Sequence, residues 1–399
     1  MRHDSTIDTT AANLRSVAEL VVADHAAAPC AVVGGAVRGS REGLPVSTTS
    51  EADGWRFGWG AAGVLWTRPP ALLRTEPPSA STHHIFDLAS LTKPIVALTL
   101  ARLQQAGTLD RREPLAAFLP ELADTPSGSV SLDLLSAHRA GLEAHRPFFV
   151  AEAGATQPDA ARVLAEAAAA RRAECVGVPP REGFPPVYSD LGYMLIGEAL
   201  ARRAGVPLDD LVAREVTRPL GLTLGSVRYL ERQEPMAQRR LVPTEDVAWR
   251  GGVLHGVVHD ENAWILAGKG TAGHAGLFGD VWSVVRLGTA IVDAWWGRRE
   301  RWLDRASLEP LVAVRPGGPQ AAGFERRSPG RDGGPPSSGA LFGPETVGHL
   351  GFTGTSLWVD LQAQRVGVLL TNRVHPSRDH IAIRAARPAV YDALVEALG

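Results

Sequence analysis

The feature that most constrains the fold is the stretch from Phe86 to Asp110. Behind Ser90 and Lys93 it carries apolar residues on almost every side of a predicted helix, namely Ile95, Val96, Ala97, Leu98, Leu100, Ala101 and Leu103. A helix without a polar face is buried. The helix is expected to stop at Gly107, a residue type that favours helix C-termini. The chain must therefore place other elements on all sides of this helix.

Ser90 and Lys93 lie three residues apart, so both side chains fall on one face of the predicted first turn. Pro94 is compatible with that turn, because first-turn N–H groups have no helical partner. The positive end of the helix dipole favours charge that develops on the serine hydroxyl. A lysine held beside it with little water has a lowered pKa and can act as a base. The pair predicts a nucleophile with its activator, although a serine here can also be only a helix cap.

Lysine usage favours the catalytic interpretation. Of 41 Lys and Arg residues, only Lys93 and Lys269 are lysine. Arginine could not replace Lys93 as a base, because its pKa stays too high. A chain that uses arginine nearly everywhere thus keeps lysine at the one buried position where a base is predicted.

Composition sets the broad class. A chain of 399 residues can bury a large core and form two lobes. The formal net charge of −2 gives no reason to expect nucleic acid or an anionic membrane as a partner. No apolar stretch approaches the ~20 residues that span a bilayer, and no signal peptide is apparent. Cys30 and Cys175 are too few for a disulfide framework, so we expect a cytoplasmic protein. The sequence does not indicate its oligomeric state.

The order of elements predicts an α+β fold. Strand patterns occur near both ends of the chain, and helical patterns dominate between them. The predicted elements are helix 11–26, strands 29–39 and 55–66, a helix that starts at Ser131 with this serine as its cap, helices 156–174 and 191–204, helix 280–296 with Asp280 as its cap and Gly297 as its stop, a Pro- and Gly-rich loop at 316–344, strands 349–360 and 366–372, and helix 378–398. We therefore predict one sheet domain from residues 1–105 and 270–399, with a mostly helical domain, 106–269, inserted into it.

Three motifs in order resemble a known superfamily. They are Ser90-x-x-Lys93, Tyr188-Ser189-Asp190 and the stretch His349-Leu-Gly-Phe-Thr-Gly354. Together with flanking phrases at 134–142, 188–193, 258–263 and 273–278, they resemble the serine β-lactamase and penicillin-binding-protein superfamily. The resemblance is strongest to the class C β-lactamase-related branch, which includes carboxylesterases and D-amino-acid peptidases. It covers roughly residues 28–395 and implies an antiparallel sheet flanked by helices, with the site between sheet and helical domains.

The resemblance also implies residue roles. Ser90 attacks a carbonyl and forms an acyl-enzyme, while Lys93 and Tyr188 share the proton transfers. Tyr188 needs a nearby positive charge to become a phenolate near neutral pH. The backbone N–H groups of Ser90 and Phe352 form the oxyanion hole. Neither a cofactor nor a metal is implied.

Two residues depart from the better-known members. Asp190 stands where asparagine is frequent, and an ionised carboxylate only accepts hydrogen bonds. It can pair with Lys93 and hold the lysine charged. His349 stands where lysine is usual, and a neutral histidine attracts a substrate carboxylate less. This favours esters or uncharged amides, unless the fold supplies an arginine. We assign Asp190, His349 and Gly351 to substrate binding or support of the site.

An alternative is a metal site formed by His255, His259, Asp260 and His274. No glutamate follows the first histidine as a zinc-hydrolase motif requires, and neighbouring glycines disfavour a helix. We instead predict loop histidines bonded to the backbone, and a tight loop at Gly273–Gly276 in which the glycines are structural. The glycines at 34, 35 and 39 lie in a strand pattern and do not predict a phosphate loop.

The sequence thus predicts a serine hydrolase with a small-molecule ester or amide substrate, and an esterase more than a β-lactamase or D-amino-acid peptidase. Two other functions stay open. A sensor of the same fold would be acylated once without turnover, and an acyltransferase would pass the acyl group to an alcohol or amine. We expect neither nucleic acid nor a membrane as partner.

Overall fold

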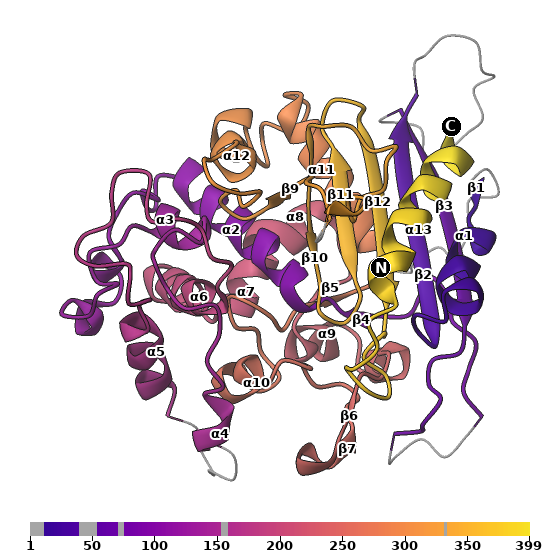
Figure 1. Ribbon diagram of the computed structural model, residues 1–399, viewed down its shortest axis with the longest axis horizontal. Coiled ribbons are helices and arrows are strands. Elements are labelled where there is room, and N and C mark those ends of the chain that lie inside the picture. The colour runs from indigo at the N-terminus through magenta and orange to yellow at the C-terminus, as the bar shows by residue number, and fades with distance from the viewer. Residues whose placement is uncertain (1–11, 40–53, 71–75, 153–158, 331–332) are drawn as a thin grey trace.

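The computed structural model describes residues 12–39, 54–70, 76–152, 159–330 and 333–399. Its main sheet joins the two ends of the chain, in the order β1-β3-β2-β12-β11-β10-β9 (Figure 1). The strands are β1 (Ala12–Asn13), β2 (Cys30–Arg38), β3 (Trp55–Gly63), β9 (Glu325–Arg326), β10 (Thr346–Leu350), β11 (Ser356–Asp360) and β12 (Arg365–Thr371). All neighbours are antiparallel except β1 and β3. The α+β fold is confirmed.

Helices cover both faces of this sheet, and β2 is therefore buried along almost its whole length. Adjacent glycines of β2 show the two faces. A Cβ atom at Gly34 would meet Val281 of α11 (Val281–Trp295), and one at Gly35 would meet Leu398 of α13 (Ile383–Leu398). α1 (Arg15–Glu19) and a wider turn at Leu20–Asp24 pack with α13.

The helix that carries Lys93 is buried as predicted. α2 (Thr92–Gln105) is enclosed along Thr92–Ala101, and Gly107 follows it with a left-handed φ of +69°. α2 packs on α7 (Leu208–Val212) and α12 (Arg305–Val312). One detail of the prediction is wrong: Ser90 lies in a separate 3₁₀ turn, Ala89–Leu91, and only Lys93 lies in the first turn of the α-helix.

The middle of the chain is mostly helical and lies beside the sheet, away from its β1–β3 edge (Figure 1). Its helices are α3 (Leu132–Ser136), α4 (Phe149–Glu152), α5 (Ala160–Ala169), α6 (Asp190–Ala204), α8 (Arg218–Leu220), α9 (Val227–Gln233) and α10 (Glu261–Ala267). Short strands form two small sheets, β4 (Phe86–Asp87) with β8 (Phe278–Gly279) and β5 (Leu224–Gly225), and β6 (Asp246–Val247) with β7 (Gly252–Val253). The domain boundaries stay a prediction.

Caps confirm several predicted boundaries. Ser131 accepts a hydrogen bond from the backbone at the start of α3, and Asp280 does so for α11, which is followed by Gly297 at a φ of +68°. Within the described residues no helix is both long and apolar enough to cross a bilayer.

Other boundaries were predicted wrongly. The strand predicted at 349–360 is two strands, β10 and β11, because the chain turns back at 351–355, where Gly354 has a φ of +98°. The loop predicted at 316–344 contains β9. The helices predicted at 156–174 and 378–398 are shorter, at Ala160–Ala169 and Ile383–Leu398, and residues 153–158 lie outside the described part.

A close backbone approach joins α6 to the loop at 271–276. A Cβ atom at Gly273 would lie 1.8 Å from the carbonyl oxygen of Tyr193, and one at Gly197 would lie 2.7 Å from the amide nitrogen of Gly273. The same loop brings the carbonyl oxygen of His274 to 3.1 Å from Lys93 Nζ. The predicted tight loop with structural glycines is confirmed.

Substitution of Gly273 by alanine is therefore expected to destabilise the protein. The added methyl group meets backbone rather than a flexible side chain, so α6 and the loop must separate. Overpacking of this kind typically costs about 1–3 kcal/mol. Urea unfolding of Gly273→Ala measures the loss. The control Gly39→Ala, whose Cβ would approach nothing closer than 3.9 Å, is expected to unfold like the wild type. Equal stability of the two variants would contradict the close approach.

Candidate active site

Ser90 follows a strained backbone position. Ala89 has a left-handed φ of +48°, which costs a residue with a Cβ atom about 1–3 kcal/mol. The buried side chain of Asp87 holds this conformation, since its two oxygens accept hydrogen bonds from the N–H groups of Ala89 (2.8 Å) and His259 (2.7 Å). Ser90 is thereby presented on a fixed turn ahead of α2.

Lys93 is completely buried and makes four polar contacts. Its Nζ atom lies 2.8 Å from Ser90 Oγ and 3.1 Å from the carbonyl oxygen of His274. It also lies 2.7 Å from Asp190 Oδ1. Tyr188 completes the cluster, because its hydroxyl interacts with Lys93 and Ser90 and the centre of its ring lies 4.9 Å from Lys93 Nζ. The predicted catalytic residues Ser90, Lys93 and Tyr188 are therefore brought together.

Asp190 decides the charge of this cluster. Burial is the largest influence and disfavours the ammonium form, but the charge of Asp190, with contributions from Tyr188 and the hydrogen bonds to both residues, raises the pKa of Lys93 above its ordinary value. Burial also disfavours the carboxylate, yet Lys93 holds the pKa of Asp190 below its usual range. Burial raises the pKa of Tyr188. At neutral pH the resting site thus holds an ammonium, a carboxylate and a protonated tyrosine.

This charge state confirms one expectation and corrects another. Asp190 pairs with Lys93, as its position in the second motif predicted. The expected lowering of the Lys93 pKa is wrong, because a lysine beside a carboxylate is stabilised as the cation. A phenolate on Tyr188 is likewise disfavoured in the resting site, since burial outweighs the attraction of Lys93.

His138 holds Tyr188 in place, a role that the sequence did not single out. It has a left-handed φ of +60°, and its Nδ1 atom accepts a hydrogen bond from the N–H of Ser189 at 3.0 Å. Its ring centre lies 4.7 Å from that of Tyr188. Burial and the nearby Lys93 lower the pKa of His138 to about 3, so the ring is neutral. The signal lay in the phrase at 134–142, which contains this histidine.

The turn between β10 and β11 packs on the segment that precedes Ser90. Thr353 Oγ1 donates to the carbonyl oxygen of Asp87 at 2.8 Å, and Thr355 Oγ1 donates to that of Leu88 at 3.1 Å. Gly351 permits this contact, because a Cβ atom there would lie 2.0 Å from Thr355 Oγ1. Phe352 thus lies on a turn that packs on the segment before the nucleophile, with half of its surface exposed. The oxyanion hole of Ser90 and Phe352 N–H groups stays a prediction.

His349 is buried and neutral. Its Nδ1 atom lies 2.9 Å from the carbonyl oxygen of Leu350, and its ring centre lies 5.8 Å from that of Tyr188. Burial, together with the charge of Lys93, lowers the pKa of His349 to about 3. This position of the third motif therefore carries no positive charge near neutral pH.

The histidines of the alternative metal site each have a different partner. His255 Nε2 contacts the carbonyl oxygen of Leu241, as the loop interpretation predicted. The other two do not follow that prediction, because the ring of His259 bonds Glu245 at 2.8 Å and that of His274 bonds Asp260 at 2.9 Å. In the described part of the chain no three His, Cys, Asp or Glu side chains are grouped as a metal site requires.

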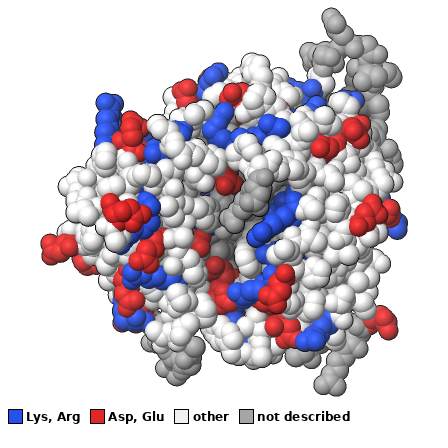
Figure 2. Space-filling view, in the orientation of Figure 1, with Lys and Arg blue, Asp and Glu red and all other residues white. Residues whose placement is uncertain are grey.

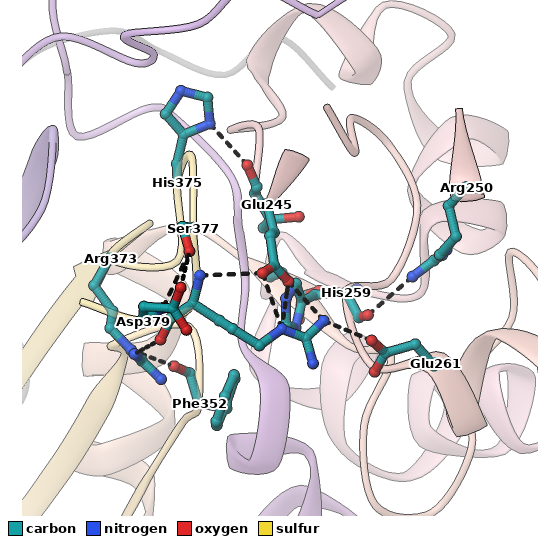
Figure 3. Close-up of polar contacts among 12 residues, drawn as sticks. Glu245, Arg250, His259, Glu261, Phe352, Arg373, His375, Ser377 and Asp379 are labelled. Carbon is teal, nitrogen blue, oxygen red and sulfur yellow. Dashed lines mark hydrogen bonds and ion pairs between the residues drawn. The ribbon is translucent and has the colours of Figure 1, made fainter. Parts of the chain in front are cut away.

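A buried ionic network supports the turn that carries Phe352 (Figure 3). Glu245 accepts hydrogen bonds from His259 and from Arg378, whose guanidinium also reaches Glu261 at 2.5 Å. These partners overcome burial and lower the pKa of Glu245 to about 2. The ring of His259 in turn stacks on Phe352, with ring centres 5.7 Å apart. Sequence reasoning missed this network, because Arg378 lies far in sequence from Glu245 and Glu261.

Arg373 lies on the other side of the Phe352 ring. Its guanidinium carbon is 4.5 Å from the ring centre, and its Nε atom donates to the Phe352 carbonyl oxygen at 2.7 Å. The face in Figure 2 is hollowed near its centre, with acidic and basic side chains on its rim. The site thus combines a serine on a fixed turn, a buried ion pair and an exposed aromatic ring.

Comparisons with known proteins agree with this geometry. A family model described as Beta-lactamase matches residues 38–391. A putative D-alanyl-D-alanine carboxypeptidase of Escherichia coli K12 is 29% identical over 336 residues, which cover 80% of this chain and 76% of the relative. A protein of the same description from Salmonella agona is 28% identical over 325 residues, covering 76% and 72%.

Solved structures show the same fold. The D-amino acid amidase of Ochrobactrum anthropi superposes with a TM-score of 0.64 at 18% identity, covering 96% of this chain and 99% of that chain. The class C β-lactamase of Rhodobacter sphaeroides gives a TM-score of 0.64 at 17% identity, also covering 96% and 99%. At these identities the likeness concerns the fold alone.

Replacement of Asp190 by asparagine is expected to destabilise the protein in a pH-dependent way. Breaking a buried ion pair from one side typically costs about 3–5 kcal/mol. In the wild type the raised pKa makes Lys93 stabilising below the unfolded-state pKa of ~10.4. In Asp190→Asn, burial dominates and lowers the Lys93 pKa, so the folded state is penalised until the pH nears ~10.4.

Urea unfolding of both proteins across this range checks the prediction. The difference in unfolding free energy should be largest near neutral pH and should shrink as the pH rises. A difference that is constant with pH would show that Asp190 does not set the charge of Lys93.

Proposed function

The chain belongs to the β-lactamase family and is a serine hydrolase, and from that premise we propose that it hydrolyses uncharged esters or amides through an acyl-enzyme on Ser90. The contact that carries the proposal is the 2.8 Å distance between Lys93 Nζ and Ser90 Oγ. Tyr188 interacts with both groups and gives the site a second proton carrier. The substrate is a small molecule that enters beside Phe352.

The reaction follows from these positions. Ser90 Oγ bonds to the carbonyl carbon and loses its proton to the Lys93–Tyr188 pair, while the carbonyl π electrons move to the oxygen. The N–H groups of Ser90 and Phe352 stabilise that oxyanion, and loss of one such donor typically costs ~2.7–4 kcal/mol. The leaving group takes the proton as its bond to carbon breaks. Water then repeats the attack on the acyl-enzyme and restores Ser90.

The charges of the site favour a substrate without a carboxylate near the scissile bond. His349 is neutral near pH 7, so the third motif offers no cation. Asp190 neutralises the charge of Lys93, so this ion pair offers no net positive charge to an anionic group. The half-exposed ring of Phe352 offers an apolar surface instead. These features support esters over penicillins.

A second candidate is a carboxypeptidase for peptides that end in a D-amino acid. Relatives described as putative D-alanyl-D-alanine carboxypeptidases favour it. So does Arg373, which lies on Phe352 and makes no ion pair with a carboxylate among the described residues. A guanidinium there can receive the peptide carboxylate that His349 does not attract.

Two alternatives share the first chemical step. A sensor would stay acylated, and an acyltransferase would deliver the acyl group to an alcohol or amine instead of water. Mass spectrometry of the protein after exposure to excess ester distinguishes the first, and products formed with added alcohol distinguish the second. The cytoplasmic location stays a prediction from the sequence.

Replacement of Ser90 by alanine is expected to abolish turnover, because it removes the hydroxyl that contacts both Lys93 and Tyr188. We would assay a short p-nitrophenyl ester, a chromogenic cephalosporin and a peptide ending in D-alanyl-D-alanine. The exposed helical Ser16→Ala serves as the matched control. Ester turnover that Ser90→Ala loses supports the proposal. Turnover of the cephalosporin or peptide alone favours the other substrates, and full activity of Ser90→Ala excludes the serine mechanism.

Truncation of Phe352 tests the apolar surface. Phe352→Ala keeps the backbone N–H group but removes the ring, so KM should rise about 10-fold for a hexanoyl or octanoyl ester, a loss of about 1.4 kcal/mol in binding. The acetyl ester should change much less, because it cannot reach the ring. Equal effects on long and short esters would mean that Phe352 supports the turn rather than the substrate.

A further inference from the structure

The resting charge of Lys93 poses a problem for the proposed chemistry. Lys93 and Tyr188 both hold their protons in the resting site, so the pair must lose one before it can take the proton of Ser90. The Lys93 side chain has no solvent exposure. Its contacts are Ser90 Oγ, the His274 carbonyl oxygen, Tyr188 and Asp190. Of these, Asp190 is the acceptor whose second oxygen faces away from the lysine.

That second oxygen meets a histidine near the surface. Asp190 Oδ2 lies 3.5 Å from His145 Nδ1, and the His145 side chain is 45% exposed, against 19% for Asp190. One carboxylate therefore contacts a fully buried ammonium with one oxygen and a half-exposed imidazole with the other. The geometry describes a path from Lys93 to solvent.

The loop around His145 is fixed on this carboxylate. The N–H of Asp190 donates to the carbonyl oxygen of Ala144 at 3.0 Å, and Ser189 Oγ donates to that of Glu143 at 2.6 Å. On the other side, Asn262 Nδ2 donates to the carbonyl oxygen of Arg146 at 2.8 Å. These three hydrogen bonds fix the backbone on both sides of His145 beside the site.

We propose that His145 is a proton-transfer residue that connects Lys93, through Asp190, to solvent. The inference rests on the proposed function and adds a residue to it. It also gives a reason for Asp190, because an asparagine amide cannot take up and release a proton near neutral pH.

The transfer balances in two steps. One N–H bond of the Lys93 ammonium breaks as an O–H bond forms on Asp190, which leaves a neutral amine and a carboxylic acid. The acid turns and gives this proton to Nδ1 of neutral His145, which then releases its Nε2 proton to water. The cluster loses one proton, no atom changes oxidation state, and Lys93 can accept the proton of Ser90.

The surroundings of His145 fix the sign of its pH dependence. The acidic groups that act on it are Asp190, Asp260 and Glu261, and the hydrogen bond with Asp190 raises its pKa above the ordinary value. Lys93 lies behind Asp190. His145 accepts a proton only when neutral, so kcat should rise with pH through the His145 pKa and level off above it.

The test compares His145→Gln and His145→Ala with the matched control His25→Gln, a partly exposed histidine on the far helix layer. For a p-nitrophenyl ester at pH 7, kcat of both His145 variants should fall about 10- to 100-fold, the lower part of the range for acid–base groups. KM should change by less than about 2-fold, because His145 moves protons rather than binding the substrate. The acidic limb of the kcat profile should disappear, and added imidazole should restore His145→Ala in a saturable way.

An NMR titration of His145 and the activity of Ser90→Ala keep the outcome decisive. An NMR titration of His145 in the wild type should give the same pKa as the acidic limb, and this needs no variant to fold. Unchanged kcat and an unchanged pH profile, or two clearly different pKa values, would overturn the role of His145. If Ser90→Ala is inactive in those same experiments, the proposed function stands while the relay is rejected; if Ser90→Ala is active, the function itself is rejected.

Discussion

The ion pair between Lys93 and Asp190 is the interaction on which the site depends. A fully buried ammonium is costly unless a counter-charge and hydrogen-bond acceptors surround it, and here a carboxylate, a hydroxyl and a carbonyl do so. The three acceptors belong to separate segments of the chain. The hydrogen bonds and the ion pair of Lys93 Nζ therefore fix the relative positions of the 3₁₀ turn, the start of α6 and the loop at 271–276.

Backbone contacts explain how these segments come so close. Glycine at 273 lets helix α6 touch the loop, and glycine at 351 lets the β10–β11 turn reach the carbonyl oxygens before Ser90. Asp87 then uses both oxygens to hold the left-handed Ala89. Small residues and one buried carboxylate thus bring three elements together, and the positions of the reactive side chains follow from the backbone.

The sequence predicted what depends on local pattern and failed where partners come from afar. The burial of α2, the cap at Asp280 and the meeting of Ser90, Lys93 and Tyr188 followed from periodicity and motifs. The prediction of one strand at 349–360 was wrong because residues on a tight turn can keep a strand-like pattern. The predicted lowering of the Lys93 pKa was wrong because the pKa depends on the balance between burial, which lowers it, and neighbouring groups, which raise it. The His145 contact and the Glu245 network had no local signal, since Asp190 is distant in sequence from His145 and Arg378 is distant from Glu245.

The sheet described above has a consequence for how the molecule is made. Strand β2 pairs with β12, so that Val33 stands opposite Leu369. On a ribosome, β2 emerges hundreds of residues before that neighbour exists, and closing so long a loop slows folding. Until then one edge of a very apolar strand stays open to wrong pairing, a known route to aggregation. Successful production of the protein should thus depend more on protecting its nascent amino-terminal hairpin than on the reactive centre.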